Sequence, residues 1–189
     1  MSLDLYIGPM FAGKSSAILG ILRRHAFIRR NTLCLTSSLD TRYCPDARIV
    51  SHNQESYPAT ALKYLYDCID TEAFHSASCI IIEEAQFFTD LKKFVLTAVE
   101  VYNKYVICVG LDGDSDRRPF GQLLDLVPYA DKIEKFAALC SRCADGTAAI
   151  FSYRKPGAPE TQVSVGSVDQ YEALCRKHYL AATAAAAAQ

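Results

Sequence analysis

No run of about eighteen apolar residues, the length that a membrane-spanning helix needs, occurs in this chain of 189 residues. The first residues also lack the charged-then-apolar pattern of a secretory signal, so we expect a cytoplasmic protein in a reducing compartment. The formal net charge is only −1, which gives no reason to expect nucleic acid or a membrane as a partner. Internal repeats are absent too, and the length suits one main domain with a small appended module.

Disulfides are not expected, although the chain contains eight cysteines. Three of them lie inside strand-like apolar runs, where a thiol behaves as a small buried group: Cys34, Cys79 and Cys108. Three others form a pattern with a histidine, Cys140-x-x-Cys143 and Cys175-x-x-His178. This spacing predicts a tetrahedral Zn²⁺ site that closes a long loop and has a structural role. The alternative is a pair of free cysteines in a helical turn and an unrelated surface histidine.

Strand-like and helix-like runs alternate over the first two-thirds of the chain. We expect strands at 3–7, 32–36, 79–82, 105–110 and 132–137. We expect helices at 15–30, 60–67, 91–103 and 122–127, and a functional loop at 40–57. This alternation predicts an α/β fold, a parallel sheet flanked by helices, with the carboxyl ends of the strands at one edge.

The character of the sequence changes after residue 138. Residues 148–153 and 161–165 read as a hairpin that turns at 155–159, between the two halves of the zinc pattern. Residues 181–189 are nearly all alanine and carry no chemistry. We therefore predict three parts: an α/β domain at 1–138, which the motif described next makes nucleotide-binding, a zinc-binding β-hairpin domain at 139–180 and an alanine-rich tail at 181–189.

The most specific motif follows the first expected strand. It reads G-x-x-x-x-G-K-S from Gly8 to Ser15, with a helical pattern directly after it. A strand, a tight loop and a helix N-terminus in this order form the P-loop that holds the phosphates of a nucleoside triphosphate. Lys14 is expected to reach the β- and γ-phosphates, and the Ser15 hydroxyl to ligate Mg²⁺ that accompanies ATP.

A pair of acids supplies the second motif. Glu83 and Glu84 directly follow the apolar run at 79–82, the place where a P-loop protein usually holds its metal with an acid. We expect Glu83 to hold Mg²⁺ with Ser15, and Glu84 to act as a general base toward a hydroxyl acceptor. The alternative is two solvated carboxylates at the end of a strand.

Further motifs occur in a fixed order: D-T-R-Y at 40–43, E-E-A-Q-F-F at 83–88, L-D-G at 111–113, R-P-F-G at 118–121 and Tyr171 before Cys175. With the P-loop and the zinc pattern, they resemble the type II thymidine kinases, the cytosolic and viral family, over residues 3–179. The resemblance implies a RecA-like core and a zinc-held lasso over the nucleoside. It implies transfer of the γ-phosphoryl group of ATP to the 5′-hydroxyl of thymidine, for DNA synthesis. It also implies a homotetramer, feedback by dTTP and a cytoplasmic location, in the host cell if the chain is viral.

The resemblance assigns roles to individual residues. Catalysis falls to Glu84 as the base and to Lys14 and Arg42 at the transferring phosphate. The phosphate-binding loop comprises Gly8, Pro9, Met10, Phe11, Ala12, Gly13, Lys14, Ser15 and Ser16. The thymidine pocket comprises the side chains of Met10, Phe87, Leu111, Phe120 and Tyr171 and the backbone near Ser164 and Gly166.

Three residues depart from the family pattern, which generally has aspartate at Glu83, an aromatic residue at Ser115 and cysteine at His178.

Three other functions compete with the kinase. A RecA-like ATPase motor would need a basic groove with aromatic side chains for nucleic acid, which the near-neutral charge does not supply. A GTPase would need Asn-Lys-x-Asp, whereas Asn103-Lys104 is followed by Tyr105-Val106. A zinc scaffold without enzymatic activity would leave the P-loop unexplained.

Overall fold

A computed structural model of the chain describes residues 1–39, 48–50, 56–158 and 169–187. Its centre is a sheet of six strands in the order β5-β2-β6-β7-β1-β8. All neighbours in this sheet are parallel, which confirms the predicted α/β fold. The strands are β1 (Ser2–Ile7), β2 (Thr32–Ser37), β5 (Thr60–Leu62), β6 (Cys79–Ile82), β7 (Tyr105–Gly110) and β8 (Lys132–Lys135).

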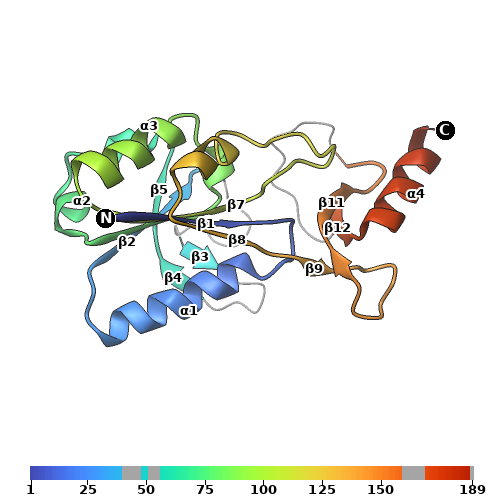
Figure 1. The fold of residues 1–189 in the computed structure, drawn as a ribbon, viewed down its shortest axis with the longest axis horizontal. Helices are drawn as coiled ribbons and strands as arrows, with labels where there is room; N and C mark the ends of the chain where they lie inside the picture. The colour runs from blue at the N-terminus through green and yellow to red at the C-terminus, as the bar shows by residue number, and fades with distance from the viewer. Residues whose placement is uncertain (40–47, 51–55, 159–168, 188–189) are drawn as a thin grey trace.

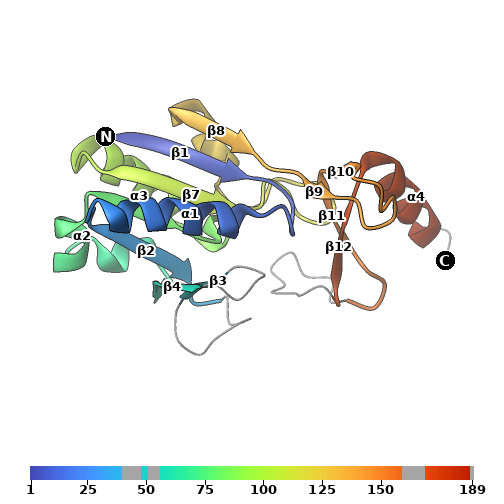
Figure 2. The ribbon, with the colours of Figure 1, turned by 90° about the horizontal axis from the view of Figure 1, so that it is seen from below.

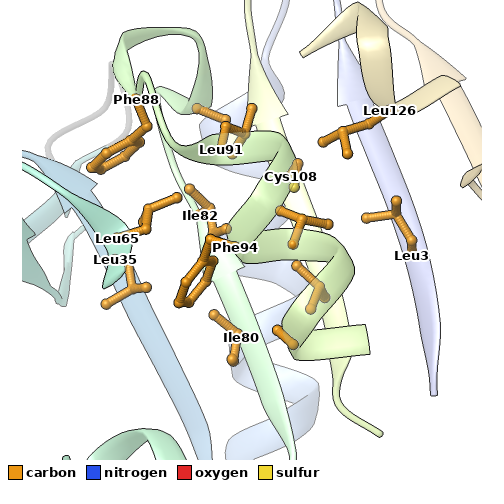
Figure 3. Packing of buried hydrophobic residues seen from close by; sticks show 14 of the residues in the cluster. Leu3, Leu35, Leu65, Ile80, Ile82, Phe88, Leu91, Phe94, Cys108 and Leu126 are labelled. Carbon is orange, nitrogen blue, oxygen red and sulfur yellow. The ribbon is translucent and has the colours of Figure 1, made fainter. Parts of the chain in front are cut away.

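Helices cover both faces of the sheet (Figure 1). One face carries α1 (Lys14–Phe27), and the other carries α2 (Glu72–Ser76) and α3 (Leu91–Leu96), which continues as a π-helical turn, η3 (Thr97–Val101). Each face has its own apolar core. Figure 3 shows the core beneath α3, where Phe94 packs near Ile80 and Ile82. Ile81, between these two, points into the core beneath α1, as a strand covered on both faces requires.

The three thiols predicted to lie in strands are buried. Burial raises the pKa of Cys34 and of Cys79 to about 12, and it raises the pKa of Cys108 as well. These thiols therefore stay protonated at neutral pH and act as small apolar side chains in the core, as predicted.

Three of the expected elements differ in the structure. The helix predicted at 60–67 is wrong: β5 pairs with β2, and only the 3₁₀ turn η1 (Leu65–Cys68) follows. Strand pairing at the sheet edge overrides the local helical pattern there. The loop predicted at 40–57 contains a short antiparallel pair, β3 (Arg48–Val50) and β4 (Ser56–Pro58). The helix predicted at 122–127 is a 3₁₀ helix, η4 (Leu124–Tyr129), that contains Pro128.

A second unit, here called the cysteine module, comprises the described residues from 138 to 158 and from 169 to 187. In it, β9 (Ala138–Leu139) pairs with β10 (Ala148–Ala149), and α4 (Arg176–Ala187) follows the last strand. Its other antiparallel pair joins β11 (Phe151–Arg154) to β12 (Tyr171–Leu174). The predicted hairpin partner at 161–165 lies outside the described residues.

The cysteine module lies at the carboxyl end of the parallel strands (Figures 1 and 2). Loops that follow the strands therefore face it. Among the helices that the structure describes, none has the length and apolar character to cross a membrane.

Candidate functional site

The register of the sheet brings the predicted motifs to one edge. Ile7, the last residue of β1, pairs with Gly110, the last residue of β7. Ile82, the last residue of β6, pairs with Cys108 of β7. The loops that follow β1, β6 and β7 therefore start close together, at the edge where parallel α/β sheets bind their ligands.

The loop from Gly8 to Gly13 has the backbone shape of an anion site. Gly8 adopts φ +150°, and a Cβ atom there would lie 2.6 Å from the backbone oxygen of Phe136, so no side chain fits. Gly13 is the N-cap of α1 and offers no capping side chain, and the first turn of α1 holds no acidic residue. The N–H groups at the start of α1 and the positive end of its dipole are thus available to phosphate.

Phe11, in the middle of this loop, adopts φ +62°, a left-handed conformation that a residue with a side chain rarely takes. Such a conformation costs on the order of 1 kcal/mol and persists only where neighbouring contacts hold it. The loop is therefore held under strain by its surroundings.

Two charged side chains meet this loop. The Lys14 ammonium group donates hydrogen bonds to the carbonyl oxygens of Gly8 (3.0 Å) and Pro9 (2.7 Å), so it lies across the loop. The Ser15 hydroxyl donates to Oε1 of Glu83 at 2.7 Å, and Glu83 is only 7% exposed. Ser15 and Glu83 thus bring oxygen atoms together beside the loop from Gly8 to Gly13, and oxygen is the ligand type that Mg²⁺ prefers.

Glu84 begins the 3₁₀ turn η2 (Ala85–Phe87) with φ +51°, again a left-handed conformation. The side-chain amide of Gln86 donates to the Glu84 carboxylate. The amide oxygen of Gln86 accepts the backbone N–H of Leu111 at 3.1 Å. Gln86, buried between them, therefore connects the acid pair after β6 to the loop after β7.

The predicted pocket residues are placed on several elements. The rings of Phe87 and Phe120 meet edge to face, with centroids 5.5 Å apart. Leu111 is joined to Gln86 as described, and Tyr171 is buried on β12 in the cysteine module. The other three expected site residues, Arg42, Ser164 and Gly166, lie outside the described residues.

The loop from 112 to 118 is organised by Asp114. Its Oδ1 atom accepts the backbone N–H groups of Asp116 (2.9 Å) and Arg118 (2.8 Å). Ser115, where the resembling family generally has an aromatic residue, is buried, and its carbonyl oxygen accepts the Tyr179 hydroxyl at 2.6 Å. The small side chain of Ser115 thus lies in a loop whose backbone is hydrogen-bonded to the cysteine module.

The four predicted metal ligands converge in the cysteine module: Cys140, Cys143, Cys175 and His178, with ligand atoms all within 4.8 Å of one another. The sulfur atoms of Cys143 and Cys175 are 3.8 Å apart, too far for a disulfide. This separation matches the roughly 3.8 Å edge of a tetrahedron with Zn–S bonds of about 2.3 Å. His Nδ1 lies 3.3 Å from the sulfur of Cys143, so the imidazole faces the thiols.

Cys140 has the environment of a metal-binding thiolate. Burial raises the pKa of its thiol, but hydrogen bonds from the backbone of Cys175, Cys143 and Arg142 and from His178 outweigh this and lower the pKa to about 6. A thiol that ionises near neutral pH is ready to bind a cation. The residues present therefore fit a closed Zn²⁺ site of the Cys₃His type.

Three residues that contact the site were not found from the sequence. Gln86 lies inside the E-E-A-Q-F-F motif, so the sequence indicated that it is near the site. The sequence did not predict its two hydrogen bonds, to Glu84 and to Leu111. Ser152 accepts the backbone N–H of Met10 at 3.0 Å from 142 residues away. Tyr179 contacts Ser115 across 64 residues of chain, and neither Ser152 nor Tyr179 belongs to a motif that pointed to this role.

Comparisons with known proteins support the motif pattern. The thymidine kinase family model matches residues 1–179. A thymidine kinase of Oryza sativa subsp. japonica is 39% identical over 182 residues, which cover 94% of this chain and 66% of that protein. Thymidine kinase a of Arabidopsis thaliana is 38% identical, over 95% of this chain and 75% of that protein. A thymidine kinase of Variola virus is 32% identical, over 94% and 96% respectively. The chain thus spans about two thirds of the rice relative and nearly all of the viral one.

The packing around Gln86 predicts a large effect of Gly121→Ala. Gly121 has φ +59°, and a Cβ atom there would lie 2.2 Å from the Gln86 backbone oxygen. Gly157→Ala is the matched control, since Gly157 has φ +85° and nothing within 4 Å of such an atom. In urea unfolding, Gly157→Ala should lose about 1 kcal/mol through backbone strain alone, and Gly121→Ala about 3 kcal/mol because of the added overlap. Equal losses in the two variants would contradict the close packing at Gln86.

Proposed function

The chain belongs to the thymidine kinase family, and on this basis we propose that it transfers the γ-phosphoryl group of ATP to the 5′-hydroxyl group of thymidine. The observation that carries the proposal is the contact of Ser15, in the phosphate loop, with Glu83, which immediately precedes Glu84. Phosphoryl transfer depends mainly on positioning and on stabilising charge, and these residues supply both at one edge of the sheet.

The phosphate loop binds the donor. The N–H groups between Gly8 and Ser16 and the N-terminus of α1 surround the phosphates, and the Lys14 ammonium group turns from the loop carbonyls to the β- and γ-phosphate oxygens. Arg42, assigned by resemblance, adds a second positive charge at the transferring group. The Lys14 ammonium group can exchange the loop carbonyl oxygens for phosphate oxygens when ATP binds, because the charged phosphate oxygens accept stronger hydrogen bonds.

Ser15 and Glu83 would hold the magnesium ion of the nucleotide. The Ser15 hydroxyl donates a hydrogen bond to Glu83, which leaves the lone pairs of the Ser15 oxygen available for a cation. Glu83 stands where the family generally has aspartate, and its longer side chain still reaches the hydroxyl. Mg²⁺ bound here would neutralise charge on the β- and γ-phosphates.

Glu84 acts as the general base. Gln86 donates a hydrogen bond to one carboxylate oxygen, which fixes the direction of the carboxylate. The second oxygen then takes the proton of the 5′-hydroxyl as the phosphoryl group is transferred. Gln86 also accepts the backbone N–H of Leu111. One side chain therefore holds both the base, Glu84, and Leu111, a wall of the proposed pocket.

Thymidine lies between aromatic and aliphatic walls. The edge-to-face pair of Phe87 and Phe120 forms one wall, Met10, Leu111 and Tyr171 contribute others, and the backbone near Ser164 and Gly166 hydrogen-bonds to the base. A flat pyrimidine fits such a pocket because apolar walls bind its faces and a few polar groups read its edge. The family resemblance further supports a homotetramer, inhibition by dTTP and a cytoplasmic location.

The cysteine module holds a structural Zn²⁺ ion. Cys140, Cys143, Cys175 and His178 supply all four positions of a tetrahedral site, so no position remains for catalysis. Zn²⁺ bound there would join both ends of the segment that contains the proposed lasso. Its role is to reduce the conformational freedom of this segment.

The activity is tested with ATP, Mg²⁺ and a panel of thymidine, deoxyuridine, deoxycytidine and 5′-deoxythymidine. Thymidine should give its 5′-monophosphate, and 5′-deoxythymidine should give no product because it lacks the accepting hydroxyl. Glu84→Gln should lower kcat about 100-fold, the usual effect of losing a general base, with ATP affinity nearly unchanged. Glu100→Gln, an exposed matched control on η3, should behave as the native chain.

Two results would contradict this proposal, the first its function and the second only the role of Glu84. One is the absence of thymidine phosphorylation by the native chain, above all if DNA stimulates ATP hydrolysis instead. The other is full activity of Glu84→Gln, which would remove the base from the mechanism while leaving the kinase assignment in place.

Zinc content tests the metal site independently of activity. Protein purified without chelators should contain about one zinc ion per chain, as a four-ligand site requires. Cys140→Ser should lose most of it, because serine supplies no thiolate. The matched control, Cys68→Ser, alters a buried cysteine in the core of the sheet beneath α3, outside the cysteine module, and should retain the metal. A metal content that is equally low in the native chain would show that the cluster is not a zinc site.

A further inference from the structure

The cysteine module contacts the phosphate loop directly. Phe11 and Ala12, at the centre of this loop, pack against the apolar core of the module, which includes Tyr153, Cys175 and Tyr179. Both views of the ribbon place the turn after β1 at the end of the sheet that faces the module (Figures 1 and 2). Phe11, a left-handed residue of the loop that is not glycine, is thus one of the two residues whose side chains reach the module.

A hydrogen bond accompanies this packing. The backbone N–H of Met10 donates to the hydroxyl of Ser152 at 3.0 Å. Ser152 is 5% exposed on β11 and pairs with Ala173 of β12. Cys175, a member of the metal cluster, lies two residues after Ala173. Few covalent and hydrogen bonds therefore separate the metal cluster from the phosphate loop.

We propose that the cysteine module positions the phosphate loop through Ser152 and Phe11, so that nucleotide affinity depends on the metal centre. The inference rests on the proposed function only in taking the loop as the ATP site. A loop whose N–H groups already converge binds phosphate more tightly than one that must be ordered on binding. Contacts with the module hold the strained Phe11 backbone in the converged form. Ser152 is thus a positioning residue for the donor nucleotide.

The module has a second attachment that does not involve Ser152. The Tyr179 hydroxyl donates to the Ser115 carbonyl at 2.6 Å, and the Arg117 guanidinium group lies 5.0 Å from the centre of the Tyr179 ring. A cavity of about 240 Å³ lies beside Ser152, lined also by Pro9, Asp114 and Phe151. Removal of the Ser152 hydroxyl therefore leaves the module attached and forces no close-packed side chain to move.

Ser152→Ala and Ser141→Ala form the matched pair for the test. Both serines belong to the module, but the Ser141 hydroxyl bonds within it, to Glu172 and to the Ala173 carbonyl. Calorimetric titration with the Mg²⁺ complex of a β,γ-imido ATP analogue should show affinity about three- to tenfold weaker for Ser152→Ala, the usual range for one hydrogen bond. Ser141→Ala should match the native chain, and zinc content should be the same in all three. Ser152→Thr, which keeps the hydroxyl, should restore most of the affinity.

Metal removal supplies the second arm of the test. Chelation should weaken nucleotide binding by the native chain, and in stripped protein Ser152→Ala should cause little further loss, because both changes act through one contact. In steady-state assays the KM for ATP should rise more than kcat falls.

Equal affinities of Ser152→Ala and Ser141→Ala, or unchanged affinity after zinc removal, would overturn the inference and leave the kinase assignment intact. Failure of the native chain to bind the nucleotide would overturn both.

Discussion

The parallel register between β1 and β7 pairs Ile7 with Gly110, and this pairing decides where the chemistry of the molecule lies. Because the two strands end at the same level, Gly8 and Leu111 leave the sheet beside each other. The pairing of β6 with β7 brings Glu83 to the same edge, within hydrogen-bonding distance of Ser15. Strands covered by helices on both faces cannot shift their register without moving buried side chains into the wrong core. The cores beneath α1 and α3 therefore also fix the positions of the phosphate loop and the acids.

A second support comes from the opposite side of the site. The cysteine module contacts the loop after β1 through Ser152 and Phe11 and the loop after β7 through Tyr179. The sheet and the module thus hold the same loops from two directions. Gln86 adds a cross-connection within the site, since it binds Glu84 and Leu111 at once. This arrangement explains how three residues of the site, Phe11, Glu84 and Arg117, keep left-handed backbone conformations that are unfavourable by themselves.

Much of the fold could be predicted from the sequence, because its signals are local. The buried strand at Cys79–Ile82 is a continuous apolar run, and the metal cluster appears as two short motifs. Elements decided by distant contacts could not be predicted in this way. Residues 60–62 form a strand only because the edge of β2 is available to them, and Ser152 meets Met10 across 142 residues of chain. The roles given to Arg42, Ser164 and Gly166 remain predictions, because these residues lie outside the described part of the chain.

The central claim is that the phosphate loop and the acid pair form one site, in which Glu84 faces the accepting hydroxyl of thymidine. A crystal structure of the chain with ADP, Mg²⁺ and thymidine tests it most directly. The account predicts the diphosphate in the loop from Gly8 to Ser15, with the 5′-oxygen of thymidine about 2.6–3.2 Å from a carboxylate oxygen of Glu84. A nucleoside bound elsewhere, or a 5′-oxygen out of reach of Glu84, would contradict it.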